Sequence, residues 1–288
     1  YLIGNTGEQS WRVMLGIMAI PSIAFIISLF FIPESPRWLI TVKKKIEEAR
    51  AILHIIDPTT VEASMAAIQA PTSGDGSSFK QFISGKFNFS ILLAFLFAFF
   101  NQLSGINAVI YYAPRILEET GLGAQTALLS TAGIGLVNLI FTMLGLRMID
   151  RFGRKYLMYI GSLGYIISLS AISIAFFLGK GSALVPILLF MFIASHAIGQ
   201  GAVIWVFISE IFPNRVRSWG ASLGSSTHWL FAALIAGLFP FFNEKLGGGI
   251  IFAFFAVMMV LQLLFVWKIM PETKGISLED LEKKLTKS

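Results

Sequence analysis

Three side-chain carboxamides lie close together in a strongly apolar part of the chain. The stretch NQLSGIN (101–107) contains Asn101, Gln102 and Asn107, and it directly follows the run FSILLAFLFAFF. A buried amide without a hydrogen-bond partner costs about 1–3 kcal/mol. Three amides so close together therefore predict that they share hydrogen-bond partners. Each amide both donates and accepts hydrogen bonds and carries no charge. This chemistry suits a neutral polyol, whose hydroxyls also donate and accept, better than it suits an ion.

The spacing of these amides predicts a break in the helix that carries them. On a regular helix Gln102 and Asn107 point about 140° apart and would not share a face. Ser104-Gly105 lies between them, and glycine tolerates backbone angles that unwind a helix. A local unwinding would bring both amides to one ligand. The alternative is that the amides hydrogen-bond neighbouring helices and hold them together.

Other groups that could contact the same ligand lie in separate apolar stretches. They are Asn138, Trp205, Trp229 and His228. Indole faces stack well on apolar ring faces, and a buried indole N–H needs a partner. The imidazole could hydrogen-bond a ligand or take up a proton. For each residue the alternative is core packing or a hydrogen bond between helices.

No catalytic or metal-binding constellation accompanies these groups. The sequence contains no Cys, no G-x-x-x-x-G-K phosphate loop and no H-E-x-x-H motif. We therefore predict neither an enzyme nor an ATP-driven pump, and we expect no cofactor and no metal.

The composition predicts an all-α integral membrane protein. The chain is 56% hydrophobic and 13% charged, whereas soluble domains carry about 25% charged residues. A helix that crosses a bilayer needs about 20 mostly apolar residues. Seven apolar runs are predicted to be transmembrane helices: 11–32, 89–112, 126–148, 156–178, 184–208, 219–242 and 249–270.

Basic residues are distributed unevenly between the two sides of these spans. If the N-terminus lies outside, four of the 22 Lys and Arg lie on the outer side: Arg12, Arg115, Lys180 and Lys245. All the others fall on the inner side, as the positive-inside rule requires. The pattern predicts a multi-pass protein with a cytoplasmic C-terminus. The net charge of +6 is explained by orientation, so we expect no nucleic-acid partner.

Two similar polar sequences follow apolar spans. FFIPESPRW (30–38) and KIMPETKGI (268–276) both contain Pro-Glu-[Ser/Thr] followed by a cation. Their equivalent positions suggest a parallel repeat of six-span units. The predicted domains are the last helix of an N-terminal bundle (1–32), a cytoplasmic helical loop (33–88), a C-terminal six-helix bundle (89–270) and a cytoplasmic tail (271–288). The other helices of the N-terminal bundle would be missing.

Local signals predict helices in both polar segments. Ser35 is typical of an N-cap and Pro36 of a first helical residue, so we expect an amphipathic helix to begin there. Its apolar face would comprise Trp38, Leu39, Val42, Ile46, Ala49 and Leu53. The stretch PTSGDGSS (71–78) predicts a flexible break. Ser277 and Asp280 resemble a capping box for a tail helix.

Five motifs in order resemble the sugar porters of the major facilitator superfamily. They are PESPRWL (33–39), NQLSGINAVIYY (101–112), DRFGRK (150–155), WVFISEIFPNRVRSWG (205–220) and PETKG (271–275). The resemblance implies the major facilitator fold, here the last span of the N-terminal half and the complete six-span C-terminal half. It implies transport of a hexose or pentose by alternating access in a cell membrane, with the proton as a candidate coupling ion. The partners implied are the sugar, the lipid bilayer and the missing N-terminal helices.

The resemblance also assigns expected roles to individual residues. Substrate contacts are expected from Asn101, Gln102, Asn107, Asn138, Trp205, His228 and Trp229. Tyr111 and Tyr112 match an extracellular gate, although an interfacial aromatic belt is the alternative. An interdomain salt-bridge latch, made in the outward-open state and broken in the inward-open one, is expected from Asp150, Arg151, Arg154, Glu210, Arg215 and Arg217.

The sequence departs from the family pattern at two places, and some alternatives stay open. Asn101 stands where the family usually has Gln, and GQGAVIW (199–205) replaces a proline-rich stretch. The pocket is therefore expected to be similar in plan and different in selectivity. A seven-helix receptor and a transporter of another polar solute are alternatives. Symport and facilitated diffusion cannot be separated, because the coupling acid of related symporters lies in a span that is absent here.

Overall fold

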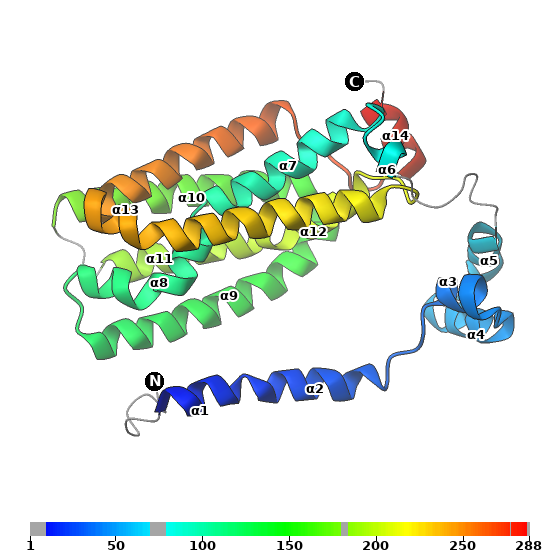
Figure 1. Ribbon diagram of the computed structural model, residues 1–288, viewed down its shortest axis with the longest axis horizontal. Coiled ribbons are helices and arrows are strands. Elements are labelled where there is room, and N and C mark those ends of the chain that lie inside the picture. Colours follow the sequence, from blue (N-terminus) through cyan, green and yellow to red (C-terminus); the bar gives the residue numbers. More distant parts are fainter. Residues whose placement is uncertain (1–9, 70–78, 180–183, 277, 287–288) are drawn as a thin grey trace. The chain divides into compact units, whose positions relative to one another are not determined.

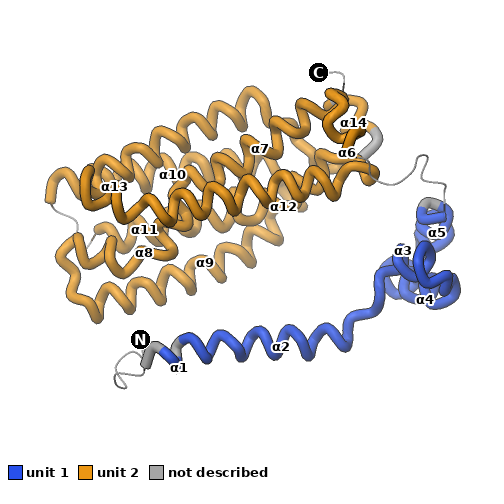
Figure 2. Tube along the Cα trace, viewed as in Figure 1, with its two compact units in different colours: residues 1–75 blue, residues 76–288 orange. Residues whose placement is uncertain are grey.

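The computed structural model describes residues 10–69, 79–179, 184–276 and 278–286, and the chain divides into two compact units, residues 1–75 and 76–288 (Figure 2). The expectations for 71–78, Lys180 and Ser277 lie outside the described residues. Every described element is helical (Figure 1). The chain therefore has the all-helical architecture that the apolar runs predicted.

The first unit contains one apolar stretch and a small helical cluster. Its elements are α1 (Ser10–Ile17), α2 (Ala19–Leu29), α3 (Pro36–Trp38), η1 (Leu39–Lys43), α4 (Ile46–Ile56) and α5 (Val61–Gln69). The core of the cluster consists of Leu39, Ile40, Ala49, Val61 and Met65.

The prediction of one continuous helix after Ser35 is wrong. Ser35 is the residue before α3 and Pro36 is its first residue, but the Ser35 side chain makes no capping hydrogen bond. Lys44 then adopts left-handed backbone angles with φ of 58°, and this separates η1 from α4. Of the expected apolar face, Leu39 and Ala49 are buried, whereas Val42 before the break and Ile46 after it are exposed.

The second unit is a bundle of long helices. Its elements are α6 (Phe79–Phe82), α7 (Asn88–Leu103), α8 (Ile106–Glu119), α9 (Ala124–Phe152), α10 (Arg154–Phe177), α11 (Leu184–His196), η2 (Ala197–Gly201), α12 (Ala202–Glu210), α13 (Arg217–Lys268) and α14 (Leu278–Thr286). Two buried apolar clusters fill it, one around Phe97 and Phe207 and the other around Tyr165 and Phe252.

The prediction of seven separate spans is wrong as a count of helices. Within the described residues, five helices are long and apolar enough to cross a membrane, and Leu15–Leu29 forms a shorter apolar helix. The predicted spans 219–242 and 249–270 belong to one element, α13, which contains a non-helical residue at Gly247 with φ of 76°. Figure 1 shows that the two arms of α13 run in opposite directions. The chain reverses direction at this glycine, whose left-handed backbone angles carry little steric cost.

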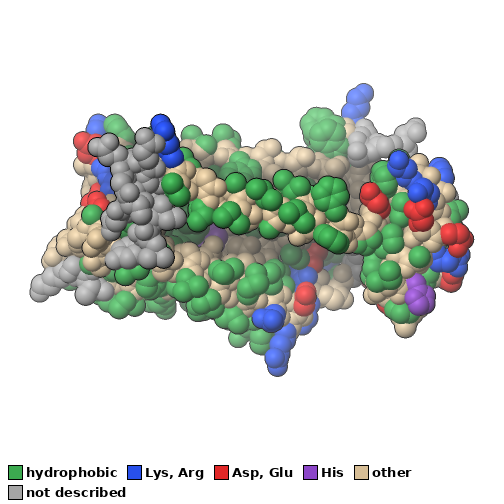
Figure 3. Space-filling view, turned by 90° about the horizontal axis from the view of Figure 1, so that it is seen from below, with side chains coloured by type: hydrophobic (Ala, Val, Ile, Leu, Met, Phe, Trp, Pro, Cys, Tyr) green, Lys and Arg blue, Asp and Glu red, His purple; other side chains and the backbone are tan. Residues whose placement is uncertain are grey.

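The surface agrees with a hydrocarbon environment. Figure 3 shows hydrophobic side chains along the lengths of the long helices, with Lys, Arg, Asp and Glu gathered near helix ends. Large side chains such as Phe254, Val257 and Leu261 of α13 are about half exposed. Exposed apolar area on this scale is costly in water and favourable in lipid.

Candidate functional site

The predicted break lies at Gly105, between α7 and α8. Gly105 has φ of 82°, in the left-handed region that favours glycine. A Cβ atom added there would lie 2.5 Å from the Phe255 ring, so the close approach of α13 also requires glycine. Ser104 Oγ donates to the Asn101 carbonyl oxygen at 2.6 Å and accepts from the Ile106 N–H at 3.3 Å. The serine thereby satisfies backbone groups that the interrupted helix leaves open.

The break brings the carboxamides together around Gln102. Asn107 Nδ2 donates to Gln102 Oε1 at 2.8 Å, and Gln102 Nε2 donates to Asn101 Oδ1 at 3.0 Å. Gln102 Nε2 also lies 3.1 Å from both ring nitrogens of His228, which belongs to the first arm of α13. Asn101 and Gln102 are fully buried in the unit, and Asn107 is half-buried. Because Gln102 uses both ends of its amide, it connects three other polar groups.

Two indoles flank the histidine that contacts Gln102. The ring centroid of His228 lies 5.1 Å from that of Trp205 in α12 and 5.1 Å from that of Trp229. Trp205 is 44% exposed and Trp229 is 60% exposed in this chain. Their faces are thus available to a ligand, whereas the amide behind them is fully buried. Amides, imidazole and indoles from α7, α8, α12 and α13 therefore form one continuous group, which we call the Gln102 cluster: Asn101, Gln102, Asn107, Trp205, His228 and Trp229.

Asn138 is the one proposed substrate contact that neither a hydrogen bond nor a ring contact between described residues joins to this cluster. It lies half-buried in α9, and its side chain makes no hydrogen bond with any residue that the structure describes. A substrate contact by Asn138 stays a prediction.

The two predicted gate tyrosines differ in their surroundings. Tyr112 donates from its hydroxyl to the Ala236 carbonyl oxygen at 2.9 Å, and its ring stacks on Phe239 with centroids 5.2 Å apart. Tyr111 is 56% exposed. Tyr112 therefore connects α8 to the first arm of α13, whereas the Tyr111 side chain lies on the exposed surface of α8.

The charged residues lie at the opposite end of the helices, where α9, α10, α12 and α13 meet. Arg154 makes a bidentate pair with Glu210, with Nη2–Oε1 at 2.6 Å and Nε–Oε2 at 3.1 Å. Asp150 lies 3.5 Å from Arg154. The Glu210 carboxylate thus pairs with Arg154, which lies 56 residues away in the sequence. We call Arg154, Glu210, Glu272 and Thr273 the charged cluster.

Glu272 belongs to the charged cluster, and the sequence reasoning missed its role. Its carboxylate accepts from the backbone N–H groups of Arg154 and Lys155, both at 3.0 Å, and so caps the first turn of α10. Gly153, with φ of 91°, makes room for it, since a Cβ there would lie 2.7 Å from Oε2. Burial raises the pKa of Glu272, but backbone N–H donors outweigh burial and hold its pKa below the usual value. The Pro-Glu-Thr motif at 271–273 was the sequence signal that could have indicated this role of Glu272.

The other predicted latch residues, Arg151, Arg215 and Arg217, make contacts with further parts of the chain. Arg215 pairs with Glu282 of α14, and Arg217 Nε donates to the Phe212 carbonyl oxygen at 3.3 Å. Arg151 accepts the Lys274 ammonium group on its backbone carbonyl at 2.7 Å. Thr273 Oγ1 donates to Glu210 at 2.6 Å, so the segment after α13 binds the Arg154–Glu210 pair directly.

Comparisons with known proteins agree with these arrangements. Residues 1–285 match the family described as sugar (and other) transporter. The D-xylose-proton symporter of Escherichia coli K12 is 34% identical, with 98% of this chain and 60% of that protein aligned. The glucose facilitated diffusion protein of Zymomonas mobilis is 36% identical, with 98% and 62% aligned. The chain spans about 60% of the length of these curated relatives.

A solved structure shows the same helical arrangement. The major facilitator superfamily proton:xylose symporter XylE bound to 6-bromo-6-deoxy-D-glucose is 32% identical and superposes with a TM-score of 0.82. The match covers 99% of this chain and 62% of that one. The chain is therefore part of a multi-pass membrane protein with the major facilitator fold, and it belongs to the sugar (and other) transporter family, which is a family of transporters and not of enzymes.

Proposed function

We propose that the full-length protein carries a monosaccharide, a hexose or a pentose, across the cell membrane by alternating access, and that the Gln102 cluster is half of its sugar site. The single observation that supports this best is the grouping of three carboxamides around one buried Gln102, beside two exposed indole faces. Neutral amides answer hydroxyls that both donate and accept, and indoles cover the apolar faces of a sugar ring.

The hydrogen bonds within the cluster suggest how a sugar hydroxyl could take the place of a side chain that Gln102 contacts. Asn107 donates to Gln102, and Gln102 donates to Asn101 and to the His228 ring. A sugar hydroxyl can replace Asn107 or His228 as the partner of Gln102, so binding substitutes one hydrogen bond for another. Buried amides therefore remain satisfied in both states, which avoids the cost of leaving them unpaired.

The rest of the site is proposed to come from outside this chain. The chain spans about 60% of its relatives, and the indole faces of Trp205 and Trp229 are open in the unit. We infer that an N-terminal bundle faces these indoles and closes the site, and that residues 89–270 rock against it. In this proposal residues 33–88 and 271–288 lie in the cytoplasm, because nearly all Lys and Arg lie on that side.

Relatives name the sugars to be tested. They include a D-xylose-proton symporter, an arabinose-proton symporter and two glucose transporters, one of which works by facilitated diffusion. The decisive experiment measures uptake of radiolabelled xylose, arabinose, glucose and a non-sugar polyol by cells that express the full-length protein. Saturable uptake of one sugar, lost on replacement of Gln102 by Leu, supports the proposal. Uptake of none of the sugars contradicts it.

A protonophore arm of the same experiment decides the coupling. If the proton is the coupling ion, a protonophore abolishes accumulation above the external concentration. If the protein is a facilitator, the protonophore leaves the initial rate of uptake unchanged.

The proposed orientation has its own test, because these 288 residues contain no Cys. Gly123→Cys should react with an impermeant maleimide in intact cells and Lys283→Cys should not; the reverse pattern contradicts the orientation.

A further inference from the structure

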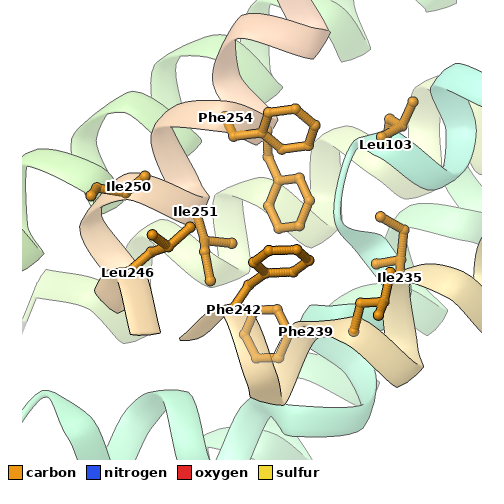
Figure 4. Close-up of a pocket in the computed structure, with 10 residues that line it drawn as sticks. Leu103, Ile235, Phe239, Phe242, Leu246, Ile250, Ile251 and Phe254 are labelled. Carbon is orange, nitrogen blue, oxygen red and sulfur yellow. The ribbon is translucent and has the colours of Figure 1, made fainter. Parts of the chain in front are cut away.

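An apolar cavity of about 360 Å³ lies in the 76–288 unit, between the end of α7 and the two arms of α13. All ten lining side chains are Leu, Ile or Phe. Figure 4 shows those of Phe242 and Ile251 converging from the facing arms of α13. The cavity volume falls within the range of about 300–1,000 Å³ that is typical of ligand sites. The cavity shares no residue with the Gln102 cluster.

The lining restricts the chemistry of an occupant. A sugar or a chain of water molecules needs polar partners, and this cavity offers none. Smaller cavities of about 150 Å³ with a similar Leu, Ile and Phe lining stay dry and bind hydrocarbon. The occupant must therefore be a hydrocarbon group.

The rim indicates where such a group comes from. Phe242, Ile250 and Phe254 line the cavity and are 43%, 46% and 48% exposed. All three belong to α13, which is long and apolar enough to cross a bilayer. The rim is thus continuous with the apolar surface of a membrane-spanning helix, and lipid tails are the hydrocarbon available there. We propose that this cavity binds an acyl chain of a bilayer lipid.

Two aromatic residues of the cavity wall touch the elements that position the Gln102 cluster. Phe255 packs over Gly105, where an added Cβ would lie 2.5 Å from its ring. Phe239 stacks on Tyr112, with centroids 5.2 Å apart and ring planes inclined by 26°. An acyl chain that contacts these two rings supports both the break before α8 and the tyrosine that ties α8 to α13. The lipid is therefore coupled to sugar affinity, a consequence that rests on the proposed function.

The binding test uses the full-length protein in bilayers that contain a phospholipid with a diazirine near the end of one acyl chain. After illumination, labelled residues are identified by peptide mass spectrometry. We expect labelling of cavity residues such as Phe242 and Phe254, reduced at least fivefold by Ile250→Trp, which fills the cavity, and increased by Ile250→Ala, which enlarges it. Val257→Trp is the matched control, because Val257 lies two turns along the same arm and is also exposed. It should leave the labelling unchanged.

Two outcomes would overturn the acyl-chain site. One is labelling of the cavity no stronger than that of Val257 and Leu261 on the open surface, with no response to Ile250→Trp. The other is that another segment of the full-length protein covers the cavity, in which case the cavity residues of the wild-type protein are not labelled at all.

The coupling test measures sugar affinity in the same bilayers. We expect Ile250→Trp to change the sugar dissociation constant about fivefold relative to Val257→Trp, the low end of usual coupling between sites. Coupling is reciprocal, so saturating sugar should change the lipid labelling of the wild-type cavity. Equal dissociation constants for both variants contradict the coupling. If no sugar binds at all while cavity labelling persists, the proposed function fails and the lipid site stands.

Discussion

The side chains of Asn107 and Gln102 are joined by a hydrogen bond of 2.8 Å across the break at Gly105. On an unbroken helix the two would point about 140° apart. The contact therefore exists only because α7 ends at Leu103 and α8 begins at Ile106. The hydrogen bond fixes the two amides relative to one another, and at the proposed sugar site such preorganisation would lower the entropy cost of binding.

Replacing Gln102 by Leu should weaken sugar binding at least tenfold, which corresponds to about 1.4 kcal/mol. The change removes an amide that contacts Asn101, Asn107 and His228. Binding of radiolabelled sugar to the purified full-length protein measures the effect. Gln262→Leu is the matched control, since Gln262 is equally buried but belongs to a separate network with Ser162 and Gln200. It should lower thermal stability and retain the affinity; unchanged affinity in Gln102→Leu would refute the site.

Replacing Gly105 by Ala should both destabilise the protein and weaken sugar binding. Left-handed backbone angles cost an alanine about 1–2 kcal/mol, and its Cβ would also clash with Phe255. Gly237→Ala is the control, because no atom lies within 4 Å of its added Cβ in the first arm of α13. That change should be neutral or stabilising by up to about 1 kcal/mol. Thermal unfolding in detergent compares the two; equal melting temperatures would argue against a required break.

Replacing Glu210 by Gln should lower stability and shift the protein toward the inward-open state. The variant removes the negative charge that faces the Arg154 guanidinium and replaces one acceptor oxygen by an amide donor, and the Arg154 side chain is only 10% exposed. Loss of one partner of such a pair costs about 3 kcal/mol. Asp150→Asn is the control, because that carboxylate is 80% exposed and its pair contributes at most about 1 kcal/mol. Cysteine accessibility at both membrane faces reports the shift, and labelling identical to wild type would exclude the latch.

Acid should destabilise the charged cluster through Glu272. Its folded pKa lies below the usual value of 4.5, so the stability that it contributes is fully present above pH 4.5. That contribution is lost as the pH falls through the lower folded pKa, because the protonated carboxyl accepts poorly from the Arg154 and Lys155 N–H groups. Melting temperatures between pH 6 and pH 3 should therefore fall less steeply for Glu272→Gln than for the wild type. Parallel curves would show that Glu272 makes no such contribution.

Local features were predictable because they depend on residues close together in the chain. The long apolar runs follow from composition, and the break at Gly105 follows from one glycine between two amides. The chain reversal at Gly247 falls between the predicted spans 219–242 and 249–270, which form the two arms of α13.

Partners that come from distant helices were beyond the reach of pattern reasoning. His228 contacts Gln102 from 126 residues away, and Glu210 reaches Arg154 across 56 residues. The buried contacts of Gln262 with Ser162, and of His196 with Tyr165, were not anticipated at all. A helix that is apolar on every side gives no sign of which face turns inward, so its rotation cannot be read from hydrophobicity.

The sequence by itself determined that this chain belongs to an all-helical membrane protein, where its long apolar runs lie, which residues carry hydrogen-bonding groups within those runs, and which family it resembles. Only the tertiary structure decided that amides, imidazole and indoles from four elements meet at Gln102, and that Glu272 caps α10. The physical reason is range: burial and backbone preference act over a few residues, whereas a site depends on how whole helices are rotated and packed against one another.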